Sequence, residues 1–571
     1  MSDLLLDVRD LHTYLRTGEE TIKAVDGISY QIKRGETFCL VGESGSGKSI
    51  SALSVMRLLP AAIASHPAGE IVFQQENLLT LPDAALRRIR GSRIAMIFQE
   101  PMTSLNPVLS IGAQIMEALQ LHNPGLSTAE AEERTIKALE QVQLPNARRR
   151  VRDFPHQLSG GQRQRVMIAM ALACEPELLI ADEPTTALDV TVQAEILRLM
   201  RELQESTGMS LLFITHDFGV VAEMAHQVGV MQQGKLVEKG VTEQVLRQPQ
   251  HAYTQQLLAA VPENLARQAG RIRGDNPSLT LPISKEGTST SADSALSLAR
   301  GDQAGVSPLI EVKNLKVWFP IKKGLFRHTV DHVKAVDDVS FELPKGGIVA
   351  LVGESGCGKT TLGRAILQLE QPTSGSVKMR GTELVGLSAK ALQPWRGRMQ
   401  IAFQDPQSSL NPRLLVETTL TEPMKVHDIG NNAEERLELA GDALERVQLK
   451  RDFLWRYPHE FSGGQRQRIG LARALVLNPA FIVCDEITSA LDVSVQAEIL
   501  QLLLAIRAER DLTLLFVTHN IGVVEYLSDW TMVMYQGKIV ERGPTAQVCG
   551  DPQDAYTQKL LAGVPRLDKV A

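Results

Sequence analysis

The sequence predicts a duplicated α/β protein, in which each half is a domain with a mostly parallel sheet covered by helices. Three observations predict this fold. The two halves contain the same short motifs in the same order. Within each half, short apolar runs typical of buried strands alternate with helical patterns. In both halves, a glycine-rich loop follows one of these runs and precedes a helix. A chain of 571 residues also exceeds the roughly 250 to 300 residues that one hydrophobic core supports.

The repeat is visible along the whole chain. The recurring segments are a glycine-rich loop, an SGGQRQR segment and a closing AYT segment, found at residues 42–49 and 353–360, at 159–165 and 462–468, and at 252–262 and 555–565. Between the halves, residues 264–307 are rich in Ser, Thr, Gly and Asp, which predicts a flexible tether. We therefore predict domains at 1–263 and 308–571, joined by a linker at 264–307.

The elements of the first half follow from its apolar pattern. Residues 4–6 are three leucines bracketed by acids, which predicts a first strand and not a signal peptide. Residues 37–41 form a short buried strand that leads into the glycine-rich loop, and apolar residues at helical spacing predict a helix after Lys48. Further strands are predicted at 178–181 and 211–215, with a helix between them.

Composition excludes several classes of protein. Hydrophobic residues at 43% and charged residues at 22% are typical of a folded globular chain. The formal charge of −6 gives no general attraction to nucleic acid or to an anionic membrane, and the basic run at 148–152 is best explained as a solvated face. No apolar run is long enough to span a membrane, so any membrane must be spanned by another polypeptide.

The five cysteines are scattered, without the paired spacing of a disulfide framework, a zinc site or an iron–sulfur site. This distribution favours a reducing, cytosolic environment and no metal cluster.

The glycine-rich loops are predicted to hold phosphate. Glycines allow the loop to curl so that its backbone N–H groups and the following helix N-terminus face an anion. Lys48 and Lys359 supply a positive charge to the β- and γ-phosphates, while Ser49 and Thr360 offer a hydroxyl to Mg²⁺. The predicted cofactor-binding residues of the loops are Gly42, Ser44, Gly45, Gly47, Lys48, Ser49, Gly353, Ser355, Gly356, Gly358, Lys359 and Thr360.

Adjacent carboxylates end an apolar strand in each half, at Asp182–Glu183 and Asp485–Glu486. The aspartates are predicted to bind Mg²⁺ and the glutamates to polarise an attacking water. Taken alone, an acidic pair at a strand end is usually a solvated turn. Its position after a phosphate loop in both halves favours the catalytic interpretation.

Glutamine and histidine follow other strands in both halves. Gln99 and Gln404 are predicted to reach the metal or the attacking water through a neutral amide. His216 and His519 are predicted to contact the γ-phosphate. A single strand-end histidine is more often packed in a core, but the equal distance from the acidic pair in both halves favours a functional role.

The SGGQ segments are the most specific signal. Each offers a hydroxyl, bare backbone N–H groups and a helix N-terminus, which together form a second anion-binding surface. The residues are Ser159, Gly160, Gly161, Gln162, Ser462, Gly463, Gly464 and Gln465. A single domain does not need two such surfaces for one triphosphate.

In this order, the motifs resemble the ATP-binding cassette of ABC transporters, and the resemblance covers nearly all of the chain except the linker. It implies two P-loop ATPase domains, each with a RecA-like core and a helical signature subdomain, that bind ATP and Mg²⁺. It also implies that the halves pair head to tail, so that ATP on one half's loop is closed over by the other half's SGGQ segment. Asp189 and Asp492 would then sit between the two sites.

Three details depart from the family pattern or are ambiguous. Ile487 stands where the first half has Pro184, and Asn520 stands where it has Asp217. The resemblance implies an aromatic residue stacked on adenine. Tyr14, beside Leu15, is the candidate in the first half. Phe319, or Trp318, is the candidate in the second half.

The SLNP segments and the AYT tails are similar to those of ATPase subunits from oligopeptide, dipeptide, nickel and glutathione importers. This resemblance implies two membrane permease subunits, a periplasmic solute-binding protein and a peripheral location on the cytoplasmic face of the bacterial inner membrane. Residues 100–107 and 405–412 would be docking surfaces for the permeases. A structural turn is the alternative explanation of SLNP.

The sequence therefore predicts an ATPase that energises import of peptides or a related small solute. The main alternative is a ribosome-associated translation factor with two cassettes, although a net-acidic chain with SLNP segments and matching tails fits it less well. A non-enzymatic scaffold conflicts with the retained glutamates.

Overall fold

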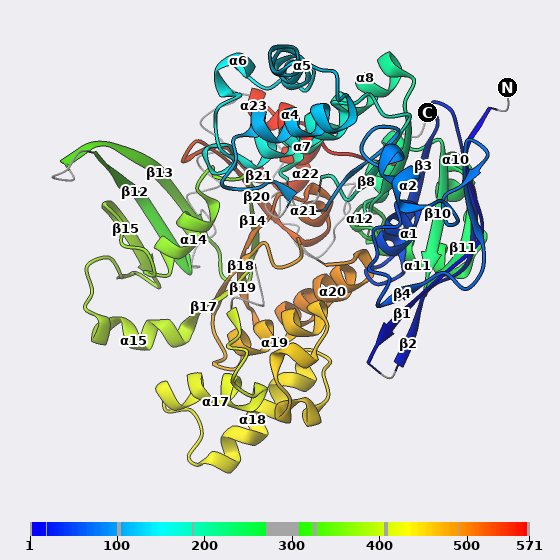
Figure 1. The fold of residues 1–571 in the computed structure, drawn as a ribbon. Coiled ribbons are helices and arrows are strands. Elements are labelled where there is room, and N and C mark those ends of the chain that lie inside the picture. The colour runs from blue at the N-terminus through cyan, green and yellow to red at the C-terminus, as the bar shows by residue number, and fades with distance from the viewer. Residues whose placement is uncertain are drawn as a thin grey trace, which may run out of the picture. The chain divides into compact units, whose positions relative to one another are not determined.

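The structure is a computed structural model that describes residues 3–18, 20–99, 104–185, 188–269, 308–323, 328–404, 409–489 and 491–567. The chain forms two compact units (Figure 1). The first comprises Met1–Ala259 together with Gly563–Ala571, and the second comprises Ala260–Ala562.

A six-stranded sheet with the order β11-β10-β3-β9-β8-β7 forms the centre of the first unit. Its strands are parallel except for the antiparallel pair of β10 and β11. Every residue of β3, β8 and β9 is buried, as expected of strands covered by helices on both faces. The strands are β3 (Thr37–Val41), β7 (Ile94–Ile97), β8 (Leu178–Asp182), β9 (Ser210–Ile214), β10 (Gln227–Gln232) and β11 (Lys235–Val241).

A second, antiparallel sheet packs beside α1 (Lys48–Val55) and shares a hydrophobic core with it. Its long strands β1 and β2 extend the strand predicted at residues 4–6 into a hairpin of two 14-residue arms. The strands are β1 (Leu4–Thr17), β2 (Glu20–Lys33), β4 (Ala64–Ser65), β5 (Glu70–Phe73) and β6 (Glu76–Asn77), and α2 (Asp83–Ile89) leads from them to β7.

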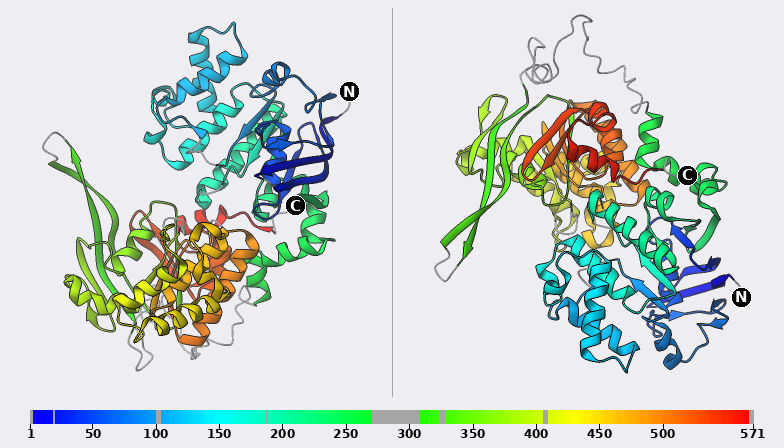
Figure 2. Two further views of the ribbon diagram at one scale, coloured as in Figure 1. Left: turned by 60° about the horizontal axis from the view of Figure 1, so that its bottom comes forward. Right: turned by 90° about the horizontal axis from the view of Figure 1, so that it is seen from above.

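Helices between β7 and β8 form a separate helical region, in which α4, α5 and α7 pack on one another. Figure 2 shows these helices, in light blue to cyan, gathered at the end of the first unit away from β1 and β2. They are α4 (Ile111–His122), α5 (Thr128–Gln141), α6 (Ala147–Arg150) and α7 (Gly160–Leu172), with the 3-10 turn Pro155–Gln157 before α7. The predicted helix between β8 and β9 is α8 (Val190–Thr207), and α9 (Phe218–Met224) follows β9.

The second unit repeats this arrangement, with a sheet of order β17-β18-β19-β14-β20-β21 and an antiparallel sheet of order β13-β12-β15-β16. Its strands are β12 (Ile310–Lys323), β13 (His328–Leu343), β14 (Ile348–Val352), β15 (Ser374–Met379), β16 (Thr382–Glu383), β17 (Met399–Ala402), β18 (Phe481–Asp485), β19 (Thr513–Val517), β20 (Trp530–Tyr535) and β21 (Lys538–Pro544). Its helices up to the closing segment are α14 (Lys359–Ile366), α15 (Ala389–Arg398), α17 (Val416–Val426), α18 (Ala433–Arg446), α19 (Gly463–Leu475), α20 (Val493–Arg510), α21 (Ile521–Leu527) and α22 (Thr545–Gly550), with 3-10 turns at Arg451–Trp455 and Pro458–Glu460.

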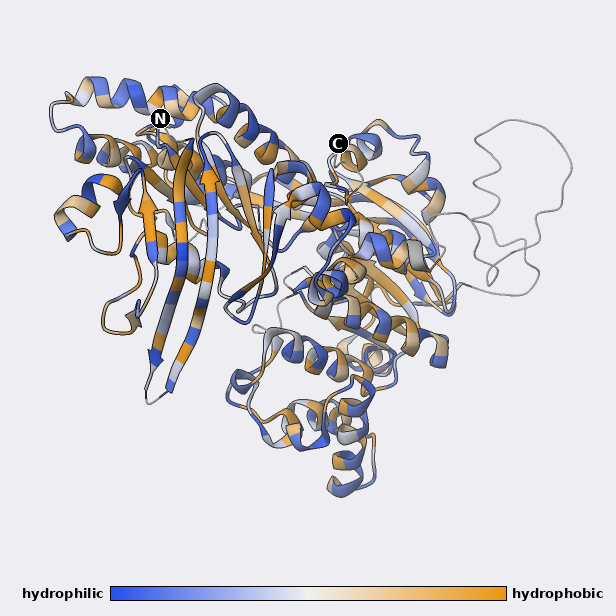
Figure 3. Cartoon of the chain, turned by 90° about the vertical axis from the view of Figure 1, so that its right-hand side faces the viewer, coloured by the Kyte–Doolittle hydropathy of each residue, from blue (hydrophilic) through white to orange (hydrophobic). Residues whose placement is uncertain are grey.

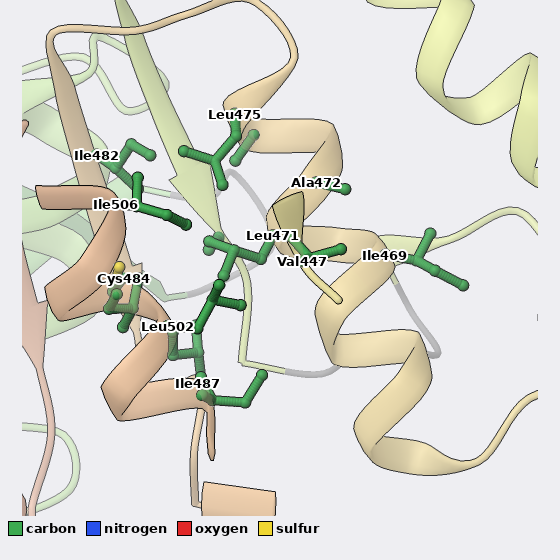
Figure 4. Packing of buried hydrophobic residues seen from close by; sticks show 14 of the residues in the cluster. Val447, Ile469, Leu471, Ala472, Leu475, Ile482, Cys484, Ile487, Leu502 and Ile506 are labelled. Carbon is green, nitrogen blue, oxygen red and sulfur yellow. The ribbon is translucent and has the colours of Figure 1, made fainter. Parts of the chain in front are cut away.

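The hydropathy of each element matches its place in the fold. Figure 3 shows the central strands mainly in hydrophobic colours, while many helices alternate between hydrophilic and hydrophobic residues. Figure 4 shows side chains of the second unit's core, contributed by α19, β18 and α20, with Ile487 among them. No helix of the described ranges is long and apolar enough to cross a membrane.

The units differ from the predicted domains at both closing segments. In the first unit the chain passes through α10 (Thr242–Arg247) and α11 (Ala252–Ala260), but α12 (Pro262–Gln268) belongs to the second unit. Residues 264–268 were predicted as linker and are helical here, while 270–307 lie outside the described residues. At the other end, α23 (Ala555–Ala562) belongs to the second unit and residues from Gly563 onward to the first. Sequence repeats identify duplicated segments but not the unit against which each segment packs.

Candidate functional site

The glycine-rich loop of the first unit connects β3 to α1 and turns tightly at its glycines. Gly42 and Gly47 have φ values of 147° and 101°, which L side chains rarely adopt. A Cβ atom at Gly47 would lie 2.2 Å from the Ala24 carbonyl oxygen, so no side chain fits there. Ser44 and Gly45 are exposed at the outer side of the loop. This loop can therefore present its backbone to a phosphate.

Lys48 folds back over this loop. Its Nζ donates hydrogen bonds of 2.7 Å to the Gly42 carbonyl and 2.8 Å to the Glu43 carbonyl. Lys359 makes the same two bonds in the second unit, 2.8 Å to Gly353 and 2.9 Å to Glu354. The amino group is thus held at the phosphate side of each loop.

The second loop has the same shape between β14 and α14. Its glycines Gly353, Gly356 and Gly358 have φ values of 150°, 80° and 111°, and Ser355 is exposed. A Cβ atom at Gly358 would lie 2.0 Å from the Ala335 carbonyl oxygen.

The residue that follows the lysine in each unit forms a hydrogen bond with the aspartate at the end of a central strand. Ser49 Oγ donates to Asp182 Oδ1 over 3.0 Å, and Thr360 Oγ1 donates to Asp485 Oδ1 over 2.9 Å. Burial raises the pKa of both aspartates above the ordinary value, and the hydrogen bonds offset only part of this effect. A hydroxyl paired with a carboxylate beside a phosphate loop is the oxygen donor set that suits Mg²⁺.

The predicted glutamine, glutamate and histidine converge in each unit. Glu183 lies at the end of β8 with a φ of 47°, and its carboxylate accepts a 3.0 Å hydrogen bond from Gln99 Nε2. His216 Nδ1 lies 3.3 Å from the other oxygen of Glu183. The structure thus brings three side chains from three strand ends to one place.

The second unit repeats this triangle of glutamine, glutamate and histidine side chains. Glu486, also at a φ of 47°, accepts a 2.9 Å hydrogen bond from Gln404 Nε2. His519 Nδ1 lies 3.5 Å from the other oxygen of Glu486. The side chains of both glutamates are 14% exposed, so water can still reach them.

In each triangle, the pairing of glutamate with histidine favours the charged form of one residue, His216 in the first unit and Glu486 in the second. Burial lowers the pKa of His216, but the Glu183 carboxylate outweighs this effect, and the net pKa lies above its ordinary value. In the second unit, burial raises the pKa of Glu486, but the hydrogen bond and charge of His519 outweigh it, and the net pKa lies below its ordinary value. A glutamate that is ionised at neutral pH is able to act on a water molecule as a base.

The SGGQ segments begin α7 and α19, in the helical regions. Ser159 and Ser462 are the N-caps of these helices and accept hydrogen bonds from the backbone N–H groups of Gln162 and Gln465. Gly160 and Gly463 are exposed, and a Cβ atom on either would meet no atom within 4 Å. These helix N-termini therefore offer uncovered backbone to an anion.

The second glycine of each segment has a packing role. A Cβ atom at Gly161 would lie 2.6 Å from Val192 of α8, and one at Gly464 would lie 2.5 Å from Val495 of α20.

The aromatic candidates occupy matching hairpins but not matching positions. Tyr14 Oη donates a 3.1 Å hydrogen bond to Asp26, and Trp318 Nε1 donates a 3.2 Å hydrogen bond to Asp337. Trp318 is therefore the structural counterpart of Tyr14, whereas Phe319 is the neighbouring residue, 38% exposed. This pairing of side chains was not recognised from the sequence, because both hairpins offer two adjacent bulky residues.

The two departures from the family pattern keep their structural roles. Asp217 and Asn520 are the N-caps of α9 and α21, and each accepts a backbone hydrogen bond from its helix. Pro184 and Ile487 are both buried. The differences therefore alter neither triangle.

Sequence reasoning missed one contact of the phosphate loops. Tyr253 and Tyr556, from the AYT segments, reach Glu43 and Glu354 of the loops through their hydroxyl groups. The repetition of AYT was the available signal, but its target lies about 200 residues away along the chain. Of the predicted docking segments, residues 100–103 and 405–408 lie outside the described residues.

Comparisons with known proteins agree with this geometry. The family model described as "ABC transporter" matches residues 25–186 and 336–489. The model described as "Oligopeptide/dipeptide transporter, C-terminal region" matches residues 237–285 and 540–571.

Curated relatives match along nearly the whole chain. "Peptidoglycan transport ATP-binding protein YejF" of Agrobacterium fabrum is 49% identical over 99% of this chain and 97% of its own length. "Glutathione import ATP-binding protein GsiA" of Salmonella paratyphi A is 47% identical over 99% of this chain and 90% of its own length. The GsiA of Escherichia coli is 46% identical over 98% of this chain and 89% of its own length.

Proposed function

The chain belongs to the ABC transporter family, as an ATP-binding protein with two ATPase cassettes, and we propose that it energises the import of a peptide or a related small solute such as glutathione. The observation that carries the importer assignment is the C-terminal region typical of oligopeptide and dipeptide transporters, which occurs after both cassettes. It favours the importer over a ribosome-associated translation factor.

Each cassette is proposed to bind the triphosphate of ATP with its glycine-rich loop. The exposed backbone at Ser44 and Gly45, and at Ser355 and Gly356, would donate hydrogen bonds to phosphate oxygens. The lysine bound to the carbonyl groups of each loop would neutralise charge on the β- and γ-phosphates.

Mg²⁺ is proposed to be held by Ser49, Asp182 and Gln99 in the first cassette and by Thr360, Asp485 and Gln404 in the second. The 3.0 Å and 2.9 Å contacts between hydroxyl and aspartate support this assignment. When bound, the ion would neutralise negative charge between the β- and γ-phosphates.

Glu183 and Glu486 are proposed as the groups that polarise the attacking water. Each carboxylate is oriented on one side by a glutamine amide and on the other by a histidine. The histidine is proposed to contact the γ-phosphate as well, since its second ring nitrogen is not used in the contact with glutamate. Orientation of the base and of the phosphate would then come from the same three side chains.

The SGGQ segment of each half is proposed to complete the ATP site of the other half. The uncovered backbone at Gly160 and Gly463 supports a role in contacting phosphate, because no side chain blocks its approach. Asp189 and Asp492 are proposed to lie between the two sites, as in the family. Adenine is proposed to stack against Tyr14 in the first half and, in the second, against Trp318, its structural counterpart, or the neighbouring Phe319.

The partners are proposed to be two integral membrane permease subunits and a periplasmic solute-binding protein, with this chain peripheral on the cytoplasmic face of a bacterial inner membrane. Solute specificity would then lie in those partners. The test is affinity purification of the chain from gently solubilised cells of its host, followed by mass spectrometry. We expect two polytopic membrane proteins in stoichiometric yield. Ribosomal proteins without a permease would contradict the proposal and support the translation-factor alternative.

A further inference from the structure

The closing AYT segment of each cassette is built onto the phosphate loop of that cassette. The hydroxyl of Tyr253, on α11, lies 3.1 Å from the Glu43 carboxylate and 3.4 Å from the Glu43 backbone nitrogen. The hydroxyl of Tyr556, on α23, accepts a 3.0 Å hydrogen bond from the Glu354 backbone N–H. Glu43 and Glu354, whose backbone N–H groups face these tyrosine hydroxyls, also accept a hydrogen bond from the loop lysine through their carbonyl groups. A single residue of the loop, Glu43 or Glu354, therefore connects the tyrosine to the lysine amino group.

Both closing segments are anchored in the same way before the tyrosine. The Glu238 carboxylate, on β11, accepts hydrogen bonds of 2.7 Å and 3.1 Å from the backbone of Gln250 and His251. The Glu541 carboxylate, on β21, accepts hydrogen bonds of 2.8 Å and 3.1 Å from Gln553 and Asp554. This repeated anchoring fixes the position of each tyrosine relative to its own loop.

Beyond the tyrosine, each closing segment leaves its own cassette. In the first half, α12 packs on α20 and α21, and Leu265 and Ala266 are part of the core of the second unit (Figure 1). In the second half, residues from Gly563 onward belong to the first unit, where Pro565 contacts α9. The exchange is reciprocal, and both segments meet the helix that directly follows the histidine of the triangle.

Each of these two helices has a glycine at the point where the closing segment packs against it. Gly219 and Gly522 both lie three residues after that histidine. A Cβ atom at Gly219 would lie 2.5 Å from the Pro565 carbonyl oxygen, a backbone atom that cannot move aside alone. A Cβ atom at Gly522 would lie 3.3 Å from Pro262 Cβ and 3.4 Å from Glu263 Cγ. The crossing segment thus requires bare backbone at Gly219, and it packs tightly against Gly522.

We propose that each closing segment is a strap that links the phosphate loop of one cassette, through Tyr253 or Tyr556, to the helix after His519 or His216 of the other. The tyrosines are positioning residues, which act on ATP through Glu43 and Glu354. Displacement of one loop by ATP is passed along the closing segment to the helix that follows the other cassette's histidine. Through the strap, ATP binding at one site favours ATP binding at the other site. This proposal rests on the proposed function, since it requires both loops to bind ATP.

The test uses the full-length chain and two variants of the second strap. Tyr556→Phe removes the hydroxyl that binds the Glu354 N–H. Its matched control is Tyr535→Phe, because the ring centroids of Tyr535 and Tyr556 lie 4.2 Å apart. Gly219→Ala displaces the strap from α9, and its matched control is Gly470→Ala, where a Cβ atom meets nothing within 4 Å. The measured quantities are kcat, KM and the Hill coefficient of ATP hydrolysis.

We expect Tyr556→Phe to raise KM for ATP about 2- to 10-fold, the effect of one lost hydrogen bond, and to change kcat less than about twofold. We expect wild type to hydrolyse ATP with a Hill coefficient above 1, and Gly219→Ala to bring the coefficient to 1. If the strap had only a structural role, the variants would lose thermal stability. Their Hill coefficient would stay at the wild-type value, and KM would not change independently of kcat.

The proposal is overturned if the wild-type Hill coefficient is 1, or if both variants match their controls in KM and Hill coefficient. Should Gly219→Ala fail to fold, the KM of Tyr556→Phe still decides. Failure of the proposed function gives a different result, because wild type would then hydrolyse ATP no faster than a variant with both Glu183 and Glu486 replaced by glutamine.

Discussion

Gln99 Nε2 donates a 3.0 Å hydrogen bond to Glu183, so the side chain that follows β7 orients the carboxylate at the end of β8. The adjacent strands β7 and β8 are parallel, and their carboxyl ends meet at the same edge of the sheet. The triangle with His216 is therefore a direct result of strand order. Gln404 and Glu486 show the same relationship in the second cassette, at 2.9 Å.

Replacing the glutamine tests this orientation. We expect Gln99→Ala, combined with Gln404→Ala, to lower kcat about tenfold or more, because the carboxylates lose the group that fixes their direction. ATP affinity, measured with a fluorescent ATP analogue, is expected to remain within about threefold of wild type. Equal loss of kcat and affinity would instead mean that the glutamines act mainly in binding.

The raised pKa of His216 gives a prediction that NMR can check. The ordinary histidine value is 6.5, and the Glu183 carboxylate holds the folded-state pKa of His216 above it. The pair therefore adds stability that is fully present below pH 6.5 and is lost as the pH rises through the folded pKa.

Labelled histidine ring carbons report this titration directly. We expect the His216 midpoint above 6.5 in wild type and below 6.5 in Glu183→Gln, since burial is then the largest remaining effect on its pKa and, together with the Lys48 charge, outweighs the Asp217 carboxylate. An unchanged midpoint in the variant would show that Glu183 does not control the protonation of His216.

The adjacent glycines of the SGGQ segment separate function from packing. Gly160→Ala places a Cβ atom in open space at the start of a helix, so we expect equal or higher stability, by at most about 1 kcal/mol. ATP hydrolysis is expected to fall sharply, because the methyl group covers the backbone that would face phosphate.

Gly161→Ala is the matched comparison. Its Cβ atom would lie 2.6 Å from Val192, so we expect a loss of about 1 to 3 kcal/mol of stability from overpacking. Thermal melting and hydrolysis measured on both variants distinguish the two effects. Normal hydrolysis by Gly160→Ala would remove the segment from the ATP site.

The hydroxyl beside each aspartate gives a prediction about metal. Ser49→Ala together with Thr360→Ala removes one oxygen donor from each proposed Mg²⁺ site. We expect the Mg²⁺ concentration for half-maximal hydrolysis to rise about tenfold, while ATP affinity in the absence of Mg²⁺ stays unchanged. A Mg²⁺ requirement equal to that of wild type would show that these hydroxyls do not bind the metal.

The parts of the fold that the sequence predicts well are set by neighbouring residues. The strand at 37–41, the loop from Gly42 to Ser49 and the helix after Lys48 depend on local apolar pattern and on glycine, so reading the chain was sufficient. The strand order that joins Gln99 to Glu183 was not available from local pattern, but repetition of both residues in each half indicated a shared role.

Other features depend on contacts between distant residues. Tyr253 and Glu43 are 210 residues apart, and nothing near either one indicates the other. The unit on which α12 packs was likewise hidden, because both halves contain equivalent surfaces. The choice between Trp318 and Phe319 as the counterpart of Tyr14 required the hydrogen bond to Asp337, which only the folded hairpin shows.

The proposed function requires ATP hydrolysis at two sites, through Glu183 and Glu486. The most direct measurement is the rate of phosphate release by wild type, by each Glu→Gln variant and by the double variant, with ATP binding measured in parallel. We predict that the double variant loses at least about 100-fold in rate, the usual contribution of a general base, while it still binds ATP. Hydrolysis by the double variant at the wild-type rate would show that neither glutamate polarises the attacking water.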